Sequence, residues 1–473
     1  MNHTIRATLF IIAFLFIVPV CQAQTESTNT PAVNQAKAWL DAFNAGDADK
    51  YKEFLRNSFP TRLQRADPDV GFREMTGGFE LRKVEEATPT KMVALVEERL
   101  SDQFARMTVE VEAAEPHRMT RLSLNAIPRP PDFALPHLSD GELITALRKR
   151  LDEDVAAGRF AGAALVARNG KTVFSQAYGL ADREKKTPNT LKTRFRLGSM
   201  NKMFTAVATL QLVQSGKLDL KAPLGKYLTD YPNKDVASKV TIEQLLTHTG
   251  GTGDIFGPEF DKRRLELKTL GDYVSLYGQR APGFEPGSRW QYSNYGFLLL
   301  GVIVEKVSGQ SYYDYVHDHI FKPAGMKATA SEPEEQTVAD RSIGYRRFAP
   351  GEWRPNTDTL PYRGTSAGGG YSTVEDLLRF ATALQTNKLL NAQYTEMLTT
   401  GKVDAGRGKY AYGFQDSVIN GTRCFGHGGG APGMNGVLQI CPGPGYVIAV
   451  LANMDPPAAS RVGDFVTNRL PMK

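Results

Sequence analysis

A serine and a lysine stand three residues apart at the start of an apolar stretch of this sequence. Ser199-Met200-Asn201-Lys202 precedes apolar residues that recur at helical spacing as far as Gly216. We therefore predict a helix that begins near Ser199 and carries the hydroxyl and the amine on one face. A desolvated lysine can take the proton of a serine hydroxyl and activate it as a nucleophile. By itself the pattern also fits a helix capped by the serine, with a surface lysine.

A second polar element, Tyr292-Ser293-Asn294, stands just before an apolar run that ends near Gly309. The run predicts a second helix, so a phenol and a carboxamide at its start can face the serine. In isolation, the tyrosine would be interpreted as interfacial packing and the asparagine as a helix cap.

A third element, His427-Gly428-Gly429, lies between two strand-like runs. Glycine at this crossing lets the backbone approach a ligand closely. Taken alone, the element also fits a flexible hairpin.

In this order and context, the three elements resemble the serine β-lactamase and penicillin-binding-protein superfamily, nearest its class C β-lactamase, DD-peptidase and esterase branch. The resemblance covers residues 139–473, and the stretches 240–251, 283–296 and 367–381 are similar to connecting segments of that branch. It implies an α/β (α+β) fold in which helices flank an antiparallel sheet and a mostly helical region is inserted between its first and last strands.

The resemblance also implies a role for each residue of the three elements. Ser199 is acylated, Lys202 and Tyr292 share proton transfer, and no metal or organic cofactor is needed. The backbone amides of Ser199 and Gly430 form the oxyanion hole. The residues expected to bind substrate are Asn294, His427, Gly428 and Gly429.

The third element departs from the Lys-Thr-Gly that β-lactamases usually carry. A histidine is only partly charged near neutral pH and glycine has no side-chain donor, so the carboxylate of a β-lactam should be held weakly. We therefore expect turnover of small esters or D-amino-acid amides and peptides, including peptidoglycan-derived ones. Two alternatives stay open: a true β-lactamase or DD-carboxypeptidase, and a catalytically silent peptidoglycan-binding protein.

The amino terminus predicts export. Arg6 precedes an apolar run from Ala7 to Val20, and the small residues Cys21 and Ala23 frame a cleavage site, so residues 1–23 fit a secretory signal peptide. The run is shorter than the roughly 20 residues that span a bilayer. A lipoprotein would use Cys21, but the bulky residue before it disfavours that interpretation. The mature protein is expected in the periplasm or the medium, with no stable membrane span.

Residues 24–126 form a separate predicted domain. Val33, Ala36, Leu40 and Phe43 recur at helical spacing, and alternating apolar residues later in this region predict strands. Helices followed by sheet resemble the small cone-shaped α+β domains of the NTF2-like superfamily, which implies a packing role or a role in docking a partner. The proline-rich stretch 127–138 is predicted to be a linker to the hydrolase domain, residues 139–473.

Charge and cysteine content exclude several functions. The formal net charge is +6 with no long basic block, so nucleic-acid binding is not indicated. Without the signal peptide two cysteines remain, too few for a zinc framework. If their strands pair about a turn near residues 431–433, Cys424 and Cys441 fall opposite each other and are predicted to form a disulfide. Among the other histidines, His248 is interpreted as structural, and His317 and His319 as an exposed helical pair.

Overall fold

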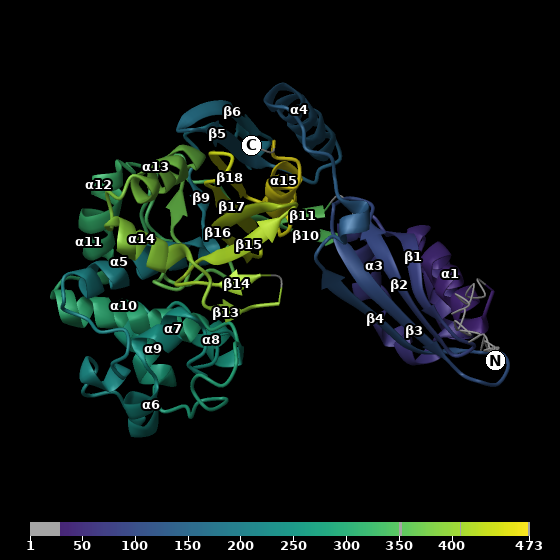
Figure 1. Ribbon diagram of the computed structural model, residues 1–473, viewed down its shortest axis with the longest axis horizontal. Coiled ribbons are helices and arrows are strands. Elements are labelled where there is room, and N and C mark those ends of the chain that lie inside the picture. The colour runs from purple at the N-terminus through teal and green to yellow at the C-terminus, as the bar shows by residue number, and fades with distance from the viewer. Residues whose placement is uncertain (1–28, 350–351, 407, 472–473) are drawn as a thin grey trace, which may run out of the picture. The chain divides into compact units, whose positions relative to one another are not determined.

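The computed structural model describes residues 29–349, 352–406 and 408–471 (Figure 1). The predicted signal peptide therefore lies outside the described residues. The chain divides into two compact units. The smaller unit contains the described residues up to Glu97 together with Ala105–Ala126, and the larger contains Glu98–Phe104 together with the residues from Ile127 onward. Among the described residues, no helix has the length and apolar character needed to cross a membrane.

The smaller unit has helices first and sheet second, as predicted. Its four strands are hydrogen-bonded in the order β1-β2-β3-β4, and short connections between successive strands make the sheet antiparallel. The predicted helical stripe of Val33, Ala36, Leu40 and Phe43 is buried in its core. The elements are α1 (Pro31–Asn44), α2 (Ala48–Ser58), α3 (Ala66–Thr76), β1 (Phe79–Ala87), β2 (Lys91–Glu98), β3 (Phe104–Val111) and β4 (Met119–Ile127).

An eight-stranded antiparallel sheet forms the centre of the larger unit, in the order β13-β14-β15-β16-β17-β18-β5-β6. The first two of these strands in the sequence therefore join the last ones, as the resemblance implied. The strands are β5 (Gly162–Arg168), β6 (Lys171–Tyr178), β13 (Val403–Asp404), β14 (Lys409–Tyr410), β15 (Gln415–Ile419), β16 (Thr422–Ala431), β17 (Met434–Cys441) and β18 (Tyr446–Ala452).

Both faces of this sheet are covered, which explains why its central strands are apolar at almost every position. On β5, Ala164 and Val166 belong to one cluster of buried side chains, whereas Ala163 and Leu165 belong to the other. The first cluster is completed by α4 (Asp140–Ala156) and α15 (Ala458–Thr467), and Figure 1 shows α15 beside β17 and β18.

The opposite face is covered by the large cluster of buried residues, to which α5 (Asn201–Gln214), α10 (Asn294–Ser308) and α13 (Val374–Gln385) contribute. The region between β6 and β13 is mostly helical. Its other helices are α6 (Lys234–Lys239), α7 (Ile242–Leu246), α8 (Pro258–Arg263), α9 (Leu270–Tyr277), α11 (Tyr312–Val316), α12 (Lys322–Ala324) and α14 (Ala392–Thr399). Its short strands are β7 (Leu180–Asp182), β8 (Thr187–Pro188), β9 (Phe195–Arg196), β10 (Tyr345–Ala349), β11 (Glu352–Pro355) and β12 (Tyr371–Ser372).

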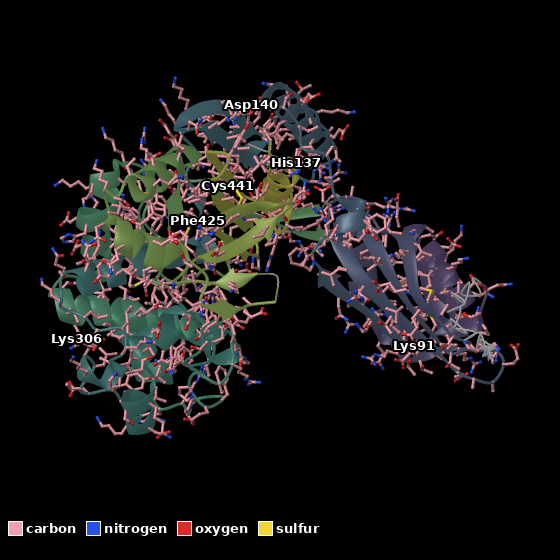
Figure 2. All side chains as sticks on the ribbon, viewed as in Figure 1. Lys91, His137, Asp140, Lys306, Phe425 and Cys441 are labelled. Carbon is pink, nitrogen blue, oxygen red and sulfur yellow. A yellow bond between two sulfur atoms is a disulfide. The ribbon has the colours of Figure 1, made fainter. Side chains whose placement is uncertain are left out.

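Two local predictions for this sheet are confirmed. The β5–β6 hairpin turns at Asn169 and Gly170, which both have positive φ as a tight two-residue turn requires. Cys424 and Cys441 form the predicted disulfide, with Cα atoms 4.2 Å apart on β16 and β17. Cys441 lies within the sheet in Figure 2. The disulfide therefore links β16, which carries the His-Gly-Gly element, to β17, the next strand in the chain.

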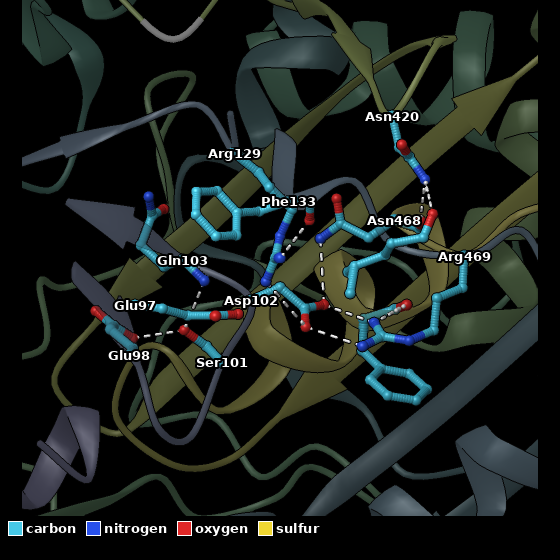
Figure 3. Close-up of polar contacts among 12 residues, drawn as sticks. Glu97, Glu98, Ser101, Asp102, Gln103, Arg129, Phe133, Asn420, Asn468 and Arg469 are labelled. Carbon is cyan, nitrogen blue, oxygen red and sulfur yellow. Dashed lines mark hydrogen bonds and ion pairs between the residues drawn. The ribbon is translucent and has the colours of Figure 1, made fainter. Parts of the chain in front are cut away.

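The proline-rich stretch is bonded to the larger unit rather than being a free spacer. His137 lies 2.6 Å from the carbonyl oxygen of Leu470, and the Leu138 amide donates to Arg469. Residues 98–104 are part of the same unit although they connect β2 and β3. Their Asp102 carboxylate receives two hydrogen bonds from the Arg469 guanidinium, at 2.6 and 2.9 Å (Figure 3).

Candidate active site

Ser199 lies in a short 3₁₀ turn, Gly198–Met200, that runs directly into α5. The predicted helix start is therefore confirmed. The alternative of a helix capped by Ser199, with a surface lysine, does not hold, because Met200 occupies the N-cap position, no side chain bonds there, and Lys202 is buried. The serine hydroxyl is thus left for other partners.

Lys202 lies in the first turn of α5, and none of its surface is exposed. Its Nζ lies 3.2 Å from Ser199 Oγ, 2.7 Å from Asn294 Oδ1 and 2.6 Å from the Ala367 carbonyl oxygen. A neutral amine has two hydrogens and one lone pair. The two carbonyl oxygens can take the hydrogens, which leaves the lone pair for the Ser199 hydroxyl.

The electrostatics of Lys202 favour that neutral form. Burial lowers its pKa to about 7, and the nearby Asp254 charge opposes the shift. A lysine with a pKa near neutrality can accept a proton and return it within one reaction cycle. The half-buried Ser199 hydroxyl and the buried Lys202 amine thus have the arrangement that a serine nucleophile and its base require.

Tyr292 and Asn294 border the same amine. Lys202 Nζ lies 4.6 Å from the centre of the Tyr292 ring, and burial raises the pKa of Tyr292 while a hydrogen bond with Ser199 partly offsets this. Asn294 is the first residue of α10, and its amide nitrogen donates to both carboxylate oxygens of Asp254, at 2.9 and 3.1 Å. The second predicted element thus joins the first through direct contacts.

The third element faces the site as an uncharged group. Tyr410 donates its hydroxyl hydrogen to His427 Nε2 over 3.0 Å, and His427 Nδ1 donates to the Gly428 carbonyl oxygen over 2.5 Å. Burial, followed by the Lys202 charge, lowers the pKa of His427 to about 3. The expectation of a partly charged histidine near neutral pH is wrong, because burial and the Lys202 charge favour the neutral ring and outweigh the opposing effect of the bond to the Gly428 carbonyl oxygen.

Backbone atoms of β16 come close to the serine turn. A methyl group added at Gly198, which has φ of +55°, would lie 3.0 Å from the Gly430 amide nitrogen. A methyl group at Gly429 would lie only 1.9 Å from the Leu197 carbonyl oxygen, whereas at Gly428 its nearest neighbour would be 3.6 Å away. The turn and the strand therefore need glycine at 198 and 429, while position 428 has room for a side chain.

His248 supports the second element from behind. It is buried, its Nδ1 accepts the backbone N–H of Ser293 at 3.1 Å, and its ring lies 4.4 Å from that of Tyr292. Burial keeps the pKa of His248 well below its ordinary value, so the ring stays neutral and remains an acceptor. This matches the structural interpretation made from the sequence.

The other histidines singled out from the sequence do not join this site. His317 bonds Asp318, and His319 lies 3.2 Å from Gln310. In the portion of the chain that the structure describes, no three His, Cys, Asp or Glu side chains gather as a metal site would require.

Three participants were missed from the sequence: Asp254, Tyr410 and the Ala367 carbonyl group. Ala367 begins one of the connecting stretches singled out above, and Asp254 follows another closely. Their closeness to Lys202 depends on segments that are far apart in the chain. The similarity of those stretches to connecting segments of the family was a signal, but the spacing of residues along the chain does not predict which of them contact Lys202.

Comparison with known proteins identifies the family. The Beta-lactamase family model matches residues 147–470. Esterase EstB of Burkholderia gladioli is 30% identical over 341 residues, which cover 64% of this chain and 86% of that protein. The penicillin-binding protein of Bacillus halodurans superposes with a TM-score of 0.60 at 31% identity, covering 69% of this chain and 98% of that one.

A D-stereospecific amidohydrolase from Streptomyces sp. superposes with a TM-score of 0.58 at 28% identity, covering 69% of this chain and 98% of that one. The chain belongs to the Beta-lactamase family, within the superfamily of serine hydrolases that contains penicillin-binding proteins, esterases and a D-stereospecific amidohydrolase. The fold inferred from the three sequence elements is therefore confirmed.

Proposed function

We propose that this protein is an exported serine hydrolase that cleaves small esters or D-amino-acid amides and peptides through an acyl-enzyme on Ser199. The observation that carries the proposal is the buried Lys202 amine, which has two carbonyl acceptors and lies 3.2 Å from the Ser199 hydroxyl. The esterase and the D-stereospecific amidohydrolase among the similar proteins support this substrate range.

In the first step, Ser199 Oγ attacks the substrate carbonyl carbon and its proton passes to Lys202 Nζ. The carbonyl oxygen becomes an oxyanion, which the backbone N–H groups of Ser199 and Gly430 stabilise. The proton then moves to the leaving alcohol or amine, with Tyr292 in contact with Ser199 as the relay. The carbon–oxygen or carbon–nitrogen bond breaks, and the acyl group remains on Ser199.

In the second step, water attacks the acyl carbon and gives a proton to Lys202. The tetrahedral intermediate collapses, Ser199 leaves with that proton, and the free acid is released. The atoms and protons balance without a cofactor. Asn294 faces Lys202 with its oxygen, so its substrate contact is limited to the amide hydrogen that Asp254 leaves available.

The neutral His427 supports esters and amides over substrates with a free carboxylate beside the scissile bond. Both ring nitrogens already have partners, and a neutral ring offers no charge to an anion. Gly428 and Gly429 add no side-chain donors. Substrate groups next to this strand would therefore bind through backbone hydrogen bonds along β16.

Labelling and turnover together test the proposal. A fluorophosphonate should modify Ser199, and purified protein should hydrolyse chromogenic esters or D-amino-acid amides faster than a cephalosporin. Peptide mapping by mass spectrometry locates the label. A chain that is neither labelled nor active on any of these compounds would instead fit the silent peptidoglycan-binding alternative.

Export and partner docking belong to the same proposal and have separate tests. Protein recovered from the periplasm or medium of an expressing bacterium should begin at Gln24 when its intact mass is measured. The smaller unit is proposed to dock a partner or pack rather than to catalyse. Recovery of only full-length protein from the cytoplasm would contradict the export proposal.

A further inference from the structure

Asp254 is a charged residue linked to the Ser199–Lys202 pair through a single side chain, that of Asn294. It takes no part in the proposed reaction steps. Its side chain is exposed, in an irregular segment between α7 and α8. At Asp254 itself, the Ile255 amide donates to the carboxylate at 2.6 Å, and Arg280 donates to the backbone oxygen at 2.7 Å. The carboxylate is therefore placed by its surroundings and is still open to solvent.

The Asp254 carboxylate decides which way the Asn294 amide points. A carboxylate only accepts hydrogen bonds, so the Asn294 group that faces it must be the NH₂, which it meets at 2.9 and 3.1 Å. The amide oxygen must then face Lys202, 2.7 Å away. With the amide reversed, its oxygen would face the two carboxylate oxygens, and its NH₂ would remove one of the two acceptors of the Lys202 hydrogens.

Orientation of Asn294 in turn orients Lys202. Asn294 Oδ1 and the Ala367 carbonyl oxygen together take the hydrogens of the neutral amine, so its lone pair is directed at Ser199. Losing either acceptor would let the amine rotate away from the hydroxyl. Reaction rates are sensitive to such misplacement, by about 100-fold for a displacement of about 1 Å.

We propose that Asp254 is a positioning residue: its carboxylate holds the Asn294 amide in the orientation that directs Lys202 towards Ser199. The proposal rests on the function proposed for Ser199 and Lys202 but concerns a different residue.

The charged and titratable groups that surround Lys202 are few. Asp254 raises the pKa of Lys202, in opposition to burial. His248 and His427 interact electrostatically with Lys202, and burial keeps both rings neutral. Tyr292 stays protonated because burial raises its pKa. Removing the Asp254 charge should therefore lower the pKa of Lys202.

The test compares kcat/KM between pH 5 and 9, on an uncharged ester, for the parent protein and Asp254→Asn. Since the reaction needs neutral Lys202, activity should rise with pH to a midpoint near the Lys202 pKa of about 7. In Asp254→Asn the midpoint should move down by roughly half to one pH unit. The plateau at high pH should fall about ten- to a hundredfold, because the Asn294 amide can now reverse.

Two variants separate positioning from general damage. Asp254→Glu keeps the charge and should keep the parent midpoint. Asp261→Asn removes an exposed carboxylate from α8 of the same region and should change neither the midpoint nor the plateau. An Asp254→Asn midpoint equal to that of the parent would overturn the proposal, as would an Asp261→Asn shift of equal size.

A measurement without catalysis keeps the proposal distinct from the proposed function. In protein labelled with ¹³C-lysine, the Lys202 Cε resonance, assigned with Lys202→Met, reports its titration directly. Its midpoint should fall in Asp254→Asn even if no ester is hydrolysed. Inactive parent protein would overturn the proposed function alone, whereas an unmoved Lys202 titration would overturn the role of Asp254.

Discussion

The two halves of the site differ in how they use charge. The helix-borne half joins Ser199, Lys202 and Asn294 to the Asp254 carboxylate through hydrogen bonds of 2.7 to 3.2 Å. The strand-borne half, on β16, offers a neutral His427 ring and glycine backbone. In the proposed function, this difference separates proton transfer from substrate discrimination: the helix-borne half would move the reacting protons, and the strand would bind the substrate.

The largest expected effect is on the helix-borne half. Ser199→Ala should reduce ester hydrolysis by about 10⁴-fold or more and abolish labelling, because it removes the attacking oxygen. Its free energy of unfolding should change little, since Ser199 caps no helix. Labelling, steady-state kinetics and urea unfolding check this. Parent-like turnover would show that another group is the nucleophile.

The second effect concerns substrate choice by the strand-borne half. Without a charged group on β16 to hold a carboxylate, cephalosporin turnover should be about ten- to a hundredfold slower than that of the best ester or D-amide. Both classes are measured on one preparation. A cephalosporin that exceeds every ester and amide tested would favour a resistance enzyme.

The third effect is on the stability of the strand-borne half. Replacing Cys424 and Cys441 by serine should lower the free energy of unfolding by about 3 kcal/mol, as the chain-entropy model gives for a loop of this size. Urea unfolding with and without reductant measures the loss. Reductant should have no effect on the double variant. Two free thiols in exported protein would contradict the disulfide.

A smaller effect should follow from adding a side chain to the strand. Gly428→Thr fits, since the nearest atom to an added methyl group is 3.6 Å away, and its hydroxyl supplies a donor to an anionic substrate. The ratio of cephalosporin to ester turnover should rise several-fold, by one hydrogen bond to a charged group. Gly429→Ser is the matched control and should instead destabilise the protein, because the Leu197 carbonyl oxygen lies 1.9 Å from the added atom.

The smallest effect on chemistry is expected from removing residues 24–126, because neither half of the site uses them. Ester turnover should stay within about twofold, because every group given a part in the reaction lies outside this range. Loss of Asp102, the partner of Arg469, should lower the free energy of unfolding by about 1–3 kcal/mol. Full-length Asp102→Asn should reproduce part of this loss. A folded truncate without ester turnover would contradict the prediction.

The sequence by itself determined the local elements and their chemistry. Spacing and apolar periodicity placed Ser199 at a helix start, Asn169-Gly170 at a hairpin and Cys424 opposite Cys441, because each depends on neighbouring residues or on one strand pairing. The resemblance of the three elements then indicated the family and the fold.

Only the tertiary structure decided the protonation states of the site residues and the direction of the hydrogen bonds between them. Asp254 meets Asn294 across 40 residues of sequence, and Ala367 meets Lys202 across 165. Burial and the Lys202 charge lower the pKa of His427 and make it neutral, although from its type alone a histidine is expected to be partly charged near neutral pH. Proton affinity depends on the partners and solvent exclusion that folding creates, and these are not encoded in the spacing of any single motif.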